Sequence, residues 1–218
     1  MRYFSIAAGA ALFLGTIGAA GAATIADFVN DFSTTTNTPG DWSYGAIASF
    51  GGALTLFPNH YQDVSRDDWN PGGRTPLVGR LNPGFGTPAG LLHPGSGGIY
   101  ADARYIVPAD VVAEISVSFA IGDPSTTTDG HVLLNGVSLF DTPIDAAHPA
   151  SAFLTTISLH TGDILDFIAG DGGNGVQFDT TLFSATLSEG VLPEPGTLAV
   201  LIMGLGGMGF ARCRKART

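Results

Sequence analysis

Cysteine and lysine are nearly absent from this chain of 218 residues. The one cysteine, Cys213, and the one lysine, Lys215, both lie within the last six residues. The rest of the chain therefore contains no thiol for a disulfide, a zinc site built on thiolates or a cysteine nucleophile. A domain of this size folds without disulfides because it is long enough to bury a substantial hydrophobic core.

Positive charge is also scarce in the middle of the chain. The sequence holds 9 Lys and Arg against 19 Asp and Glu, and five of the nine cations lie before residue 24 or after residue 190. Eighteen of the 19 acids fall between these limits, so residues 24–190 carry a formal charge of about −14. Nucleic acid is excluded as a partner because its binding requires cations that neutralise phosphates. Neutral glycans, divalent cations and cationic partners remain open.

Motifs of the common enzyme classes are missing too. The sequence has no Gly-x-Ser-x-Gly elbow, no His-Glu-x-x-His and no phosphate loop, and its five histidines lack metal-ligand spacing. Glycoside hydrolysis needs two carboxylates that meet only in the fold. The two glutamates of the central region, Glu114 and Glu189, lie on the polar face of a predicted strand and beside the tail. We therefore expect no enzymatic activity.

The first 23 residues have the three-part layout of a secretory signal peptide. Arg2 provides a positive start, residues 6–17 are apolar and uncharged, and small residues from 19 to 23 provide a cleavage site. An uncleaved anchor is the alternative, but the apolar run is short for a membrane span. We expect export, with the mature chain beginning near residue 24.

Residues 191–218 form a second targeting segment. Pro193-Glu194-Pro195 precedes an apolar stretch at 197–211, and a basic cluster follows. As a helix the stretch is ~22 Å long at ~1.5 Å per residue, short for a stable span. We expect a single membrane helix, either processed or kept as an anchor, with its cations in the cytoplasm. The basic cluster is Arg212, Arg214, Lys215 and Arg217.

Between these segments, residues 24–190 form one domain by length, and its pattern is β throughout. Polar and apolar residues alternate in Glu114–Ile121, and Asn135-Gly136 is a strong hairpin signal. No sustained helical period is present. We predict an all-β fold, an antiparallel β-sandwich of jelly-roll type. The predicted strands are Trp42–Ile47, Ala53–Phe57, Ile99–Val107, Glu114–Ile121, His131–Leu134, Val137–Phe140, Phe153–Leu159, Ile164–Ala169 and Thr181–Leu187.

Residues 62–94 interrupt this regular pattern. The segment contains five prolines and six glycines in 33 residues and shows little alternation. We expect a long loop that packs against one end of the sandwich, and a mobile insertion is the alternative.

Four aromatic residues are candidate glycan contacts, because an aromatic face packs on the C–H groups of a pyranose ring. They are Trp69, Tyr61, Trp42 and Tyr44. We expect Trp69 to be exposed because it lies in the irregular segment. Trp42 and Tyr44 share a face of a predicted strand, and that face could equally be the one that packs in the core.

Four aspartates in predicted loops raise the question of a structural calcium ion, which prefers carboxylate and carbonyl oxygens. They are Asp123, Asp129, Asp171 and Asp179. Their spacing is not that of an EF-hand, and the glycines after Asp171 also fit a turn with positive φ. We expect no other cofactor.

The tail resembles the PEP-CTERM sorting signal of Gram-negative bacteria. The matching features are Pro193-Glu194-Pro195, the glycine-rich apolar segment ending at Phe210, and the basic cluster, which Cys213 interrupts. The resemblance implies processing by an exosortase-type membrane protease, and passage through the inner membrane and periplasm to the cell surface or extracellular matrix. Proteins with this signal are associated with exopolysaccharide and biofilm formation.

The central region resembles galactose-binding-like and carbohydrate-binding-module jelly rolls, though less specifically. The matching stretches include Trp42–Gly45, Thr126–Gly136 and Gly162–Phe167. No binding residue transfers from this likeness. Two functions follow from the sequence: a non-catalytic matrix protein that binds carbohydrate such as exopolysaccharide, or a structural or adhesive matrix protein without a defined glycan ligand, stabilised by calcium.

Overall fold

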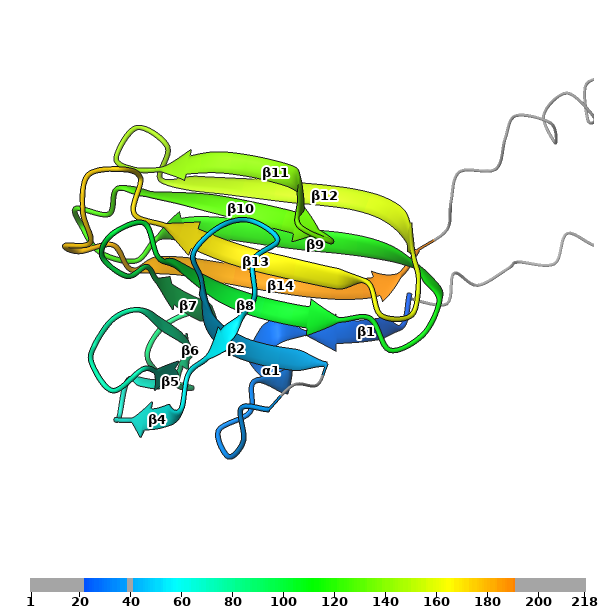
Figure 1. The fold of residues 1–218 in the computed structure, drawn as a ribbon, viewed down its shortest axis with the longest axis horizontal. Helices are drawn as coiled ribbons and strands as arrows, with labels where there is room; N and C mark the ends of the chain where they lie inside the picture. Colours follow the sequence, from blue (N-terminus) through cyan, green and yellow to red (C-terminus); the bar gives the residue numbers. More distant parts are fainter. Residues whose placement is uncertain (1–21, 39–40, 191–218) are drawn as a thin grey trace, which may run out of the picture.

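The protein folds as two antiparallel β-sheets packed face to face (Figure 1). A computed structural model describes residues 22–38 and 41–190. The predicted signal peptide at 1–23 therefore lies almost wholly outside the described residues. The processing motif Pro193–Pro195, the expected membrane helix and the basic cluster lie outside them as well. In the part that is described, no helix is both long and apolar enough to cross a membrane.

The first sheet has eight strands in the order β12-β9-β14-β7-β6-β5-β4, and β1 pairs with β14 beside this path. Figure 1 shows β12 and β4 at opposite borders of the molecule. The strands are β1 (Thr24–Asp27), β4 (Asn59–Gln62), β5 (Arg66–Asn70), β6 (Leu77–Leu81), β7 (Gly90–His93), β9 (Val111–Ile121), β12 (Ala150–Leu159) and β14 (Thr181–Glu189).

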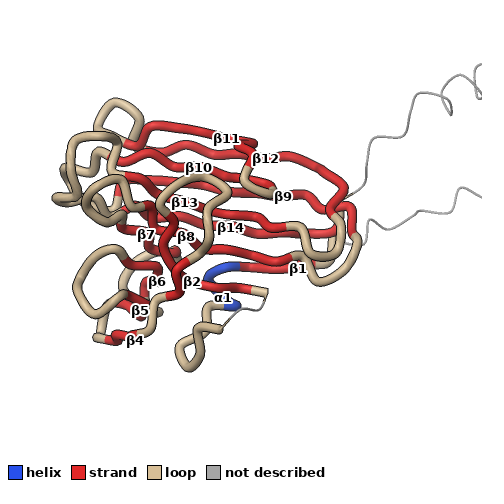
Figure 2. Tube along the Cα trace, in the orientation of Figure 1, coloured by secondary structure: helices blue, strands red, loops and turns tan. Residues whose placement is uncertain are grey.

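The second sheet has six strands in the order β11-β10-β13-β8-β2-β3. The tube in Figure 2 shows strands along most of the described chain, and one short helix, α1 (Phe28–Asp31). The strands are β2 (Trp42–Ile47), β3 (Thr55–Leu56), β8 (Tyr100–Ile106), β10 (Thr128–Leu134), β11 (Val137–Ile144) and β13 (Ile164–Gly170).

Alternating side chains build the core between the sheets. Along β9, Ile115, Val117 and Phe119 are buried whereas Ser116 and Ser118 are exposed, which confirms the alternation predicted there. The hairpin is confirmed as well, with Asn135 and Gly136 at φ 52° and 79° between β10 and β11. Each of the nine predicted strands overlaps an observed strand, and the prediction of antiparallel all-β architecture is confirmed.

The prediction of a long loop at residues 62–94 is wrong. This segment contains β5, β6 and β7, which continue the eight-stranded sheet. Four charged side chains of this segment form ion pairs: Arg66 Nε lies 2.9 Å from Asp68 Oδ2, and Arg80 Nη2 lies 3.4 Å from Asp67 Oδ2. Buried carboxylates are tolerated in a strand when a cation or a hydrogen bond partners them.

The segment after β1 covers the inner face of β5 and β6. Asp27 caps α1 by accepting hydrogen bonds from the amides of the first turn, and Phe28 is fully buried. Arg80 Nη1 donates to the Val29 carbonyl at 3.1 Å, and Trp69 Nε1 donates to the Ser33 carbonyl at 2.7 Å. Residues 28–38 thus seal this end of the molecule and bury Trp69.

Candidate functional site

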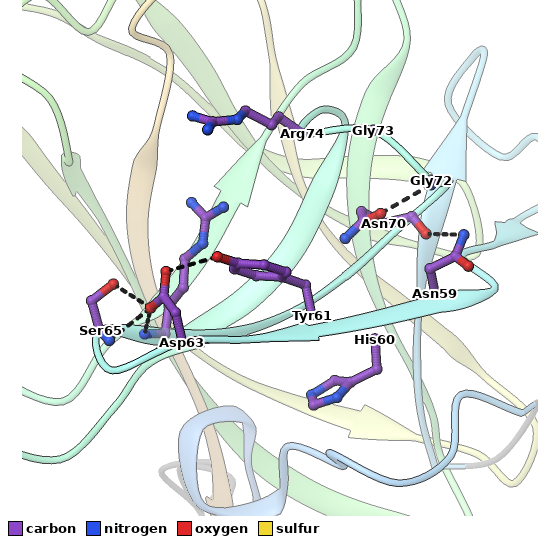
Figure 3. A pocket seen from close by; sticks show the side chains of 10 residues that line it. Asn59, His60, Tyr61, Asp63, Ser65, Asn70, Gly72, Gly73 and Arg74 are labelled. Atoms are coloured by element: carbon purple, nitrogen blue, oxygen red, sulfur yellow. Dashed lines mark hydrogen bonds between the residues drawn. The ribbon is translucent and has the colours of Figure 1, made fainter.

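A cavity of about 560 Å³ lies beside β4 and β5 (Figure 3). Its lining comes from these two strands, from the turn that joins them and from the turn between β5 and β6. The side chains are mainly polar, and Tyr61 is the one large aromatic ring that lines it. The cavity therefore combines hydrogen-bonding groups with one aromatic surface.

The β4–β5 turn is held by Asp63. Its Oδ1 accepts hydrogen bonds from the Ser65 amide and hydroxyl, both at 2.7 Å, and from the Arg66 amide at 3.0 Å. Together these bonds, led by the one from the Ser65 hydroxyl, lower the pKa of Asp63 to about 2. The other oxygen, Oδ2, accepts from the Tyr61 hydroxyl at 3.2 Å, which orients the ring at the cavity wall (Figure 3).

Tyr61 is 46% exposed. The Arg66 guanidinium carbon lies 5.6 Å from the ring centroid, within the range of a cation–π contact. Figure 3 shows His60 on the other side of the β4 ribbon from Tyr61, where its ring lies 5.2 Å from that of Trp69. The alternation of β4 therefore directs Tyr61 outward and His60 toward the covered side.

The two arginines at the cavity differ in their partners. Arg66 is paired with Asp68, whose carboxylate also accepts a hydrogen bond from Asn70 Nδ2 at 2.9 Å. Burial raises the pKa of Asp68. Arg74, on the β5–β6 turn, is exposed and forms no ion pair with any residue of 22–38 or 41–190. Arg74 is thus the cation available to a ligand at this cavity.

Of the four predicted glycan contacts, only Tyr61 is exposed. The expectation of an exposed Trp69 is wrong, because Trp69 is 6% exposed beneath residues 28–38. Tyr44 is fully buried, its hydroxyl accepts from the Ser33 amide at 2.9 Å, and burial raises its pKa to about 12. Trp42 is half-buried and packs 5.0 Å from the Tyr105 ring. The four residues form no common binding face.

The four aspartates proposed for calcium lie in or beside loops 122–127 and 171–180, where each accepts a bond from a different backbone amide. Asp123 accepts from Thr180, Asp129 from Gly172, Asp171 from Gly173 and Asp179 from Thr127, at 3.0 to 3.2 Å. Positive φ at Gly172, Gly173 and Gly175 agrees with the turn interpretation. Within residues 22–38 and 41–190, no three His, Cys, Asp or Glu side chains are grouped to hold a metal ion.

A second cavity, of about 480 Å³, contains a histidine that the sequence did not single out. His131 Nε2 lies 2.9 Å from Asp129 Oδ2, and Nδ1 lies 2.6 Å from Asp141 Oδ1. Burial acts to lower the pKa of His131, but the two carboxylates outweigh it and raise the pKa overall. The Asn135-Gly136 hairpin predicts that β10 and β11 pair, but a regular hairpin would place His131 opposite Phe140. The register shift between Val132 and Leu133, which the sequence does not indicate, places His131 opposite Asp141.

One close carboxylate pair occupies the outer face of the second sheet. Asp102 is fully buried and Asp166 is 1% exposed, and Arg104 Nε lies 2.6 Å from Asp166 Oδ1. Arg104 also donates to the Gly52 carbonyl at 3.3 Å, so the 48–54 loop covers the group. Burial raises the pKa of both carboxyls. Since no substrate reaches buried groups, this pair does not have the accessibility of a catalytic acid and base.

Comparison with known proteins identifies the C-terminal motif. Residues 191–215 match the family described as the PEP-CTERM protein-sorting motif. The match confirms the resemblance drawn from Pro193–Pro195 and the basic cluster, and it covers only the C-terminal segment. No curated protein matches the chain.

Solved structures with some similarity include carbohydrate-binding modules. The CBM51 module of a Clostridium perfringens GH95 protein, in complex with methyl-galactose, has 10% identity and a TM-score of 0.41 over 74% of this chain and 98% of that one. A Clostridium perfringens ZmpB structure with an M60 catalytic domain and two CBM51 domains has 16% identity and a TM-score of 0.41 over 73% of this chain, which spans 15% of that protein. A family 35 module from Clostridium thermocellum has 10% identity and a TM-score of 0.32 over 69% and 93%. These similarities transfer no ligand and no binding residue.

Proposed function

We propose that this protein is exported, sorted to the cell surface through its C-terminal motif, and binds carbohydrate there at the cavity beside Tyr61. The PEP-CTERM match at residues 191–215 supports sorting, with an exosortase-type protease acting near Pro193–Pro195. The signal-peptide layout of residues 1–23 supports export. The exopolysaccharide of a Gram-negative biofilm matrix is the source of sugar available at that location.

The observation that carries the proposal is the half-exposed Tyr61 ring among polar groups. A pyranose presents C–H groups that pack on an aromatic ring and hydroxyls that need hydrogen-bonding partners. Tyr61 provides the ring, and Asn59, Ser65 and Arg74 line the same cavity. The Asp63 bond to the Tyr61 hydroxyl holds the ring before a ligand arrives, which lowers the entropic cost of binding.

Charge also favours this cavity over other surfaces. Residues 24–190 carry a formal charge of about −14, so most of the surface repels an acidic polysaccharide. Two of the four arginines in that region, Arg66 and Arg74, line the cavity. Arg66, Arg80 and Arg104 are each bound to an aspartate, and Arg74 forms no ion pair among the described residues. Arg74 therefore offers a sugar that bears a carboxylate a favourable partner at this cavity.

The proposed role is binding without catalysis. Asp63 is the carboxylate that lines this cavity, and its pKa of about 2 keeps it ionised at neutral pH. A general acid must hold a proton near the working pH, which Asp63 does not. Its carboxylate instead orders the turn and orients Tyr61.

The binding test compares variants of the full chain for retention on the producer's own exopolysaccharide and on a glycan panel. We expect Tyr61→Ala to weaken binding by about tenfold or more, the effect of losing ~1.4 kcal/mol. Arg74→Ala should weaken binding to acidic glycans most. Phe85→Ala is the matched control, because Phe85 is 50% exposed and does not line the cavity. If Tyr61→Ala and Phe85→Ala are retained equally on the glycans, the cavity beside Tyr61 is excluded as the binding site.

Sorting is tested separately by deleting residues 191–218. We expect the truncated protein to accumulate in the periplasm, because both the processing motif and the membrane segment are gone. Cell fractionation with an antibody to the domain measures the distribution. Surface delivery that continues after the deletion would contradict the sorting role.

A further inference from the structure

Among the described residues the sheets have five edge strands, and four of them are protected against pairing with another chain. Edge strands expose unpaired N–H and C=O groups, and proteins shield them by short length, proline, charge or bulges. In the second sheet, β3 has two residues, and β11 contains Asp141 and Pro143 and a register shift against β10. In the first sheet, β4 has four residues and follows Pro58. β1, which pairs only with β14, has four residues, ends at Asp27 and has a register shift.

The remaining edge, β12, has none of these protections. It runs for ten residues, Ala150–Leu159, with the sequence ASAFLTTISL, which contains no charge, proline or glycine. It pairs with β9 over its whole length without a register shift, and it has no other strand partner among the described residues. A long, regular, uncharged edge of β-forming residues is a template for strand addition.

The direction of the free backbone groups follows from the β9 pairing. Ile121 N donates to Pro149 O at 3.0 Å, so residues 149, 151, 153, 155, 157 and 159 point their backbone groups toward β9. The bonds on the other side of β9 are consistent with this direction. Gly190 N donates to Val112 O, so the even-numbered residues of β9 bond toward β14 and the odd-numbered ones toward β12. The residues that direct their N–H and C=O groups to the open edge are Ala150, Ala152, Leu154, Thr156 and Ser158.

These five residues can pair with the same five residues of a second, antiparallel copy: Leu154 would lie opposite Leu154, Ala152 opposite Thr156, and Ala150 opposite Ser158. Their side chains lie on the outer face of the sheet, since Ser151, Phe153 and the other odd-numbered residues are opposite the buried residues of β9. Leu154, the middle one, is 65% exposed. An antiparallel copy centred on Leu154 would place small or neutral side chains opposite one another and the two leucines in contact across a two-fold axis.

At the β12 edge, unlike most of the surface, negative charge does not keep a second copy of the chain away. With a formal charge of about −14 on residues 24–190, two copies repel one another over most approaches. β12 carries no carboxylate, and the nearest one on its outer face is Glu114 of β9, opposite Thr156. Two β12 edges therefore meet without placing carboxylates directly opposite one another.

We propose that β12 pairs with β12 of a second copy, antiparallel about Leu154, to form one sheet that continues through both molecules. This goes beyond carbohydrate binding and does not depend on it. An assembly of two copies would present two Tyr61 cavities to one polymer, and linked sites raise the overall affinity without new contacts.

The test measures the molar mass of the full chain, with Cys213→Ser to prevent tail disulfides, by light scattering in mild detergent over a range of concentrations. We expect a concentration-dependent dimer. Ala152→Pro should make it monomeric, because the Ala152 N–H faces the open edge and the β9 ladder stays intact. Its thermal unfolding should match that of the parent chain at concentrations where the parent is monomeric. Leu154→Lys should do the same by opposing two cations. Val137→Lys is the control, because Val137 is 68% exposed on β11, and it should leave the dimer in place.

A second measurement locates the contact directly. In the Cys213→Ser background, Leu154→Cys should crosslink to dimers with a short bismaleimide, whereas Val137→Cys should not. A monomer at all concentrations overturns the proposal. A dimer that persists in both Ala152→Pro and Leu154→Lys also overturns it, whether or not that dimer depends on residues 191–218.

Discussion

The two ends of the eight-stranded sheet are stabilised by different side chains. Where β9 and β14 pair, the residues that face the core are apolar, among them Phe119 and Phe183, whose rings stack 6.4 Å apart. Where β5 and β6 pair, the covered face contains the Asp67–Arg80 ion pair beside Trp69. A sheet thus continues into a region of charged inward residues when each charge finds a partner.

The comparison predicts the largest loss of stability at the apolar end. Phe119→Ala should lower the free energy of unfolding by about 3 to 5 kcal/mol, because it leaves a cavity in a fully buried site. Urea denaturation of the full chain measures this. Phe119→Leu, which retains most of the volume, should cost clearly less. An equal loss in both variants would mean that the packing around Phe119 is not what stabilises this end.

At the charged end, Arg80→Ala should lower the free energy of unfolding by roughly 2 to 3 kcal/mol, less than a fully buried pair because Arg80 is partly exposed. The cause is an unpaired Asp67 carboxylate and a lost bond to the Val29 carbonyl. Replacing both partners, with Asp67→Leu and Arg80→Met, should restore much of the loss. A double variant as unstable as Arg80→Ala would contradict an ion pair as the main contribution.

The pH dependence of stability sharpens the same comparison. Burial raises the pKa of Asp68, so the folded chain keeps a proton that the unfolded chain releases near its ordinary pKa of 3.8. The contribution of Asp68 is therefore full below that value and falls as pH rises through the folded pKa. Asp68→Asn should flatten this part of the profile measured by urea denaturation. A profile that Asp68→Asn leaves unchanged would show that burial does not perturb this carboxyl.

The smallest expected effect on stability is at the cavity itself. Tyr61→Ala should change the free energy of unfolding by less than ~0.5 kcal/mol, because the side chain is 46% exposed and outside the core. The same thermal and urea measurements check this. A large loss would mean that Tyr61 stabilises the β4–β5 turn, and the loss of glycan retention would then need another explanation.

The apolar end was predictable from the sequence and the charged end was not. Alternation in Glu114–Ile121 identifies β9 without knowledge of any other strand. In β5, by contrast, Arg66, Asp67 and Asp68 stand in succession without alternation, within a segment whose prolines and glycines predicted a loop. Their burial depends on Arg80, which is far along the chain, and on the segment that follows β1. Tertiary contacts of this kind leave no periodic signal.

The candidate site was predictable only in part, for the same reason. Tyr61 was identified as an aromatic residue of interest, but its exposure and its bond to Asp63 come from the β4–β5 hairpin, which the sequence did not indicate. Trp69 was the residue expected to be exposed, and it is buried beneath the segment that contains Ser33. The contact between His131 and Asp141 required the β10–β11 register. In each case the sequence indicated what the side chain can do chemically, but it did not indicate whether the folded protein exposes that side chain.

The pairing of β1 with β14 has a mechanical consequence. Ala23 and Glu189 are joined by a backbone hydrogen bond of 2.8 Å, and the last strand before the sorting segment lies between β9 on one side and β1 and β7 on the other. When the C-terminus is tethered and a polymer drags on the domain, the load enters at Glu189 and runs lengthwise along β14. Its ladder bonds are perpendicular to that pull, so they must yield together rather than one after another. The strand that leads into the sorting segment is thus hydrogen-bonded on both sides, which resists a pull along its length.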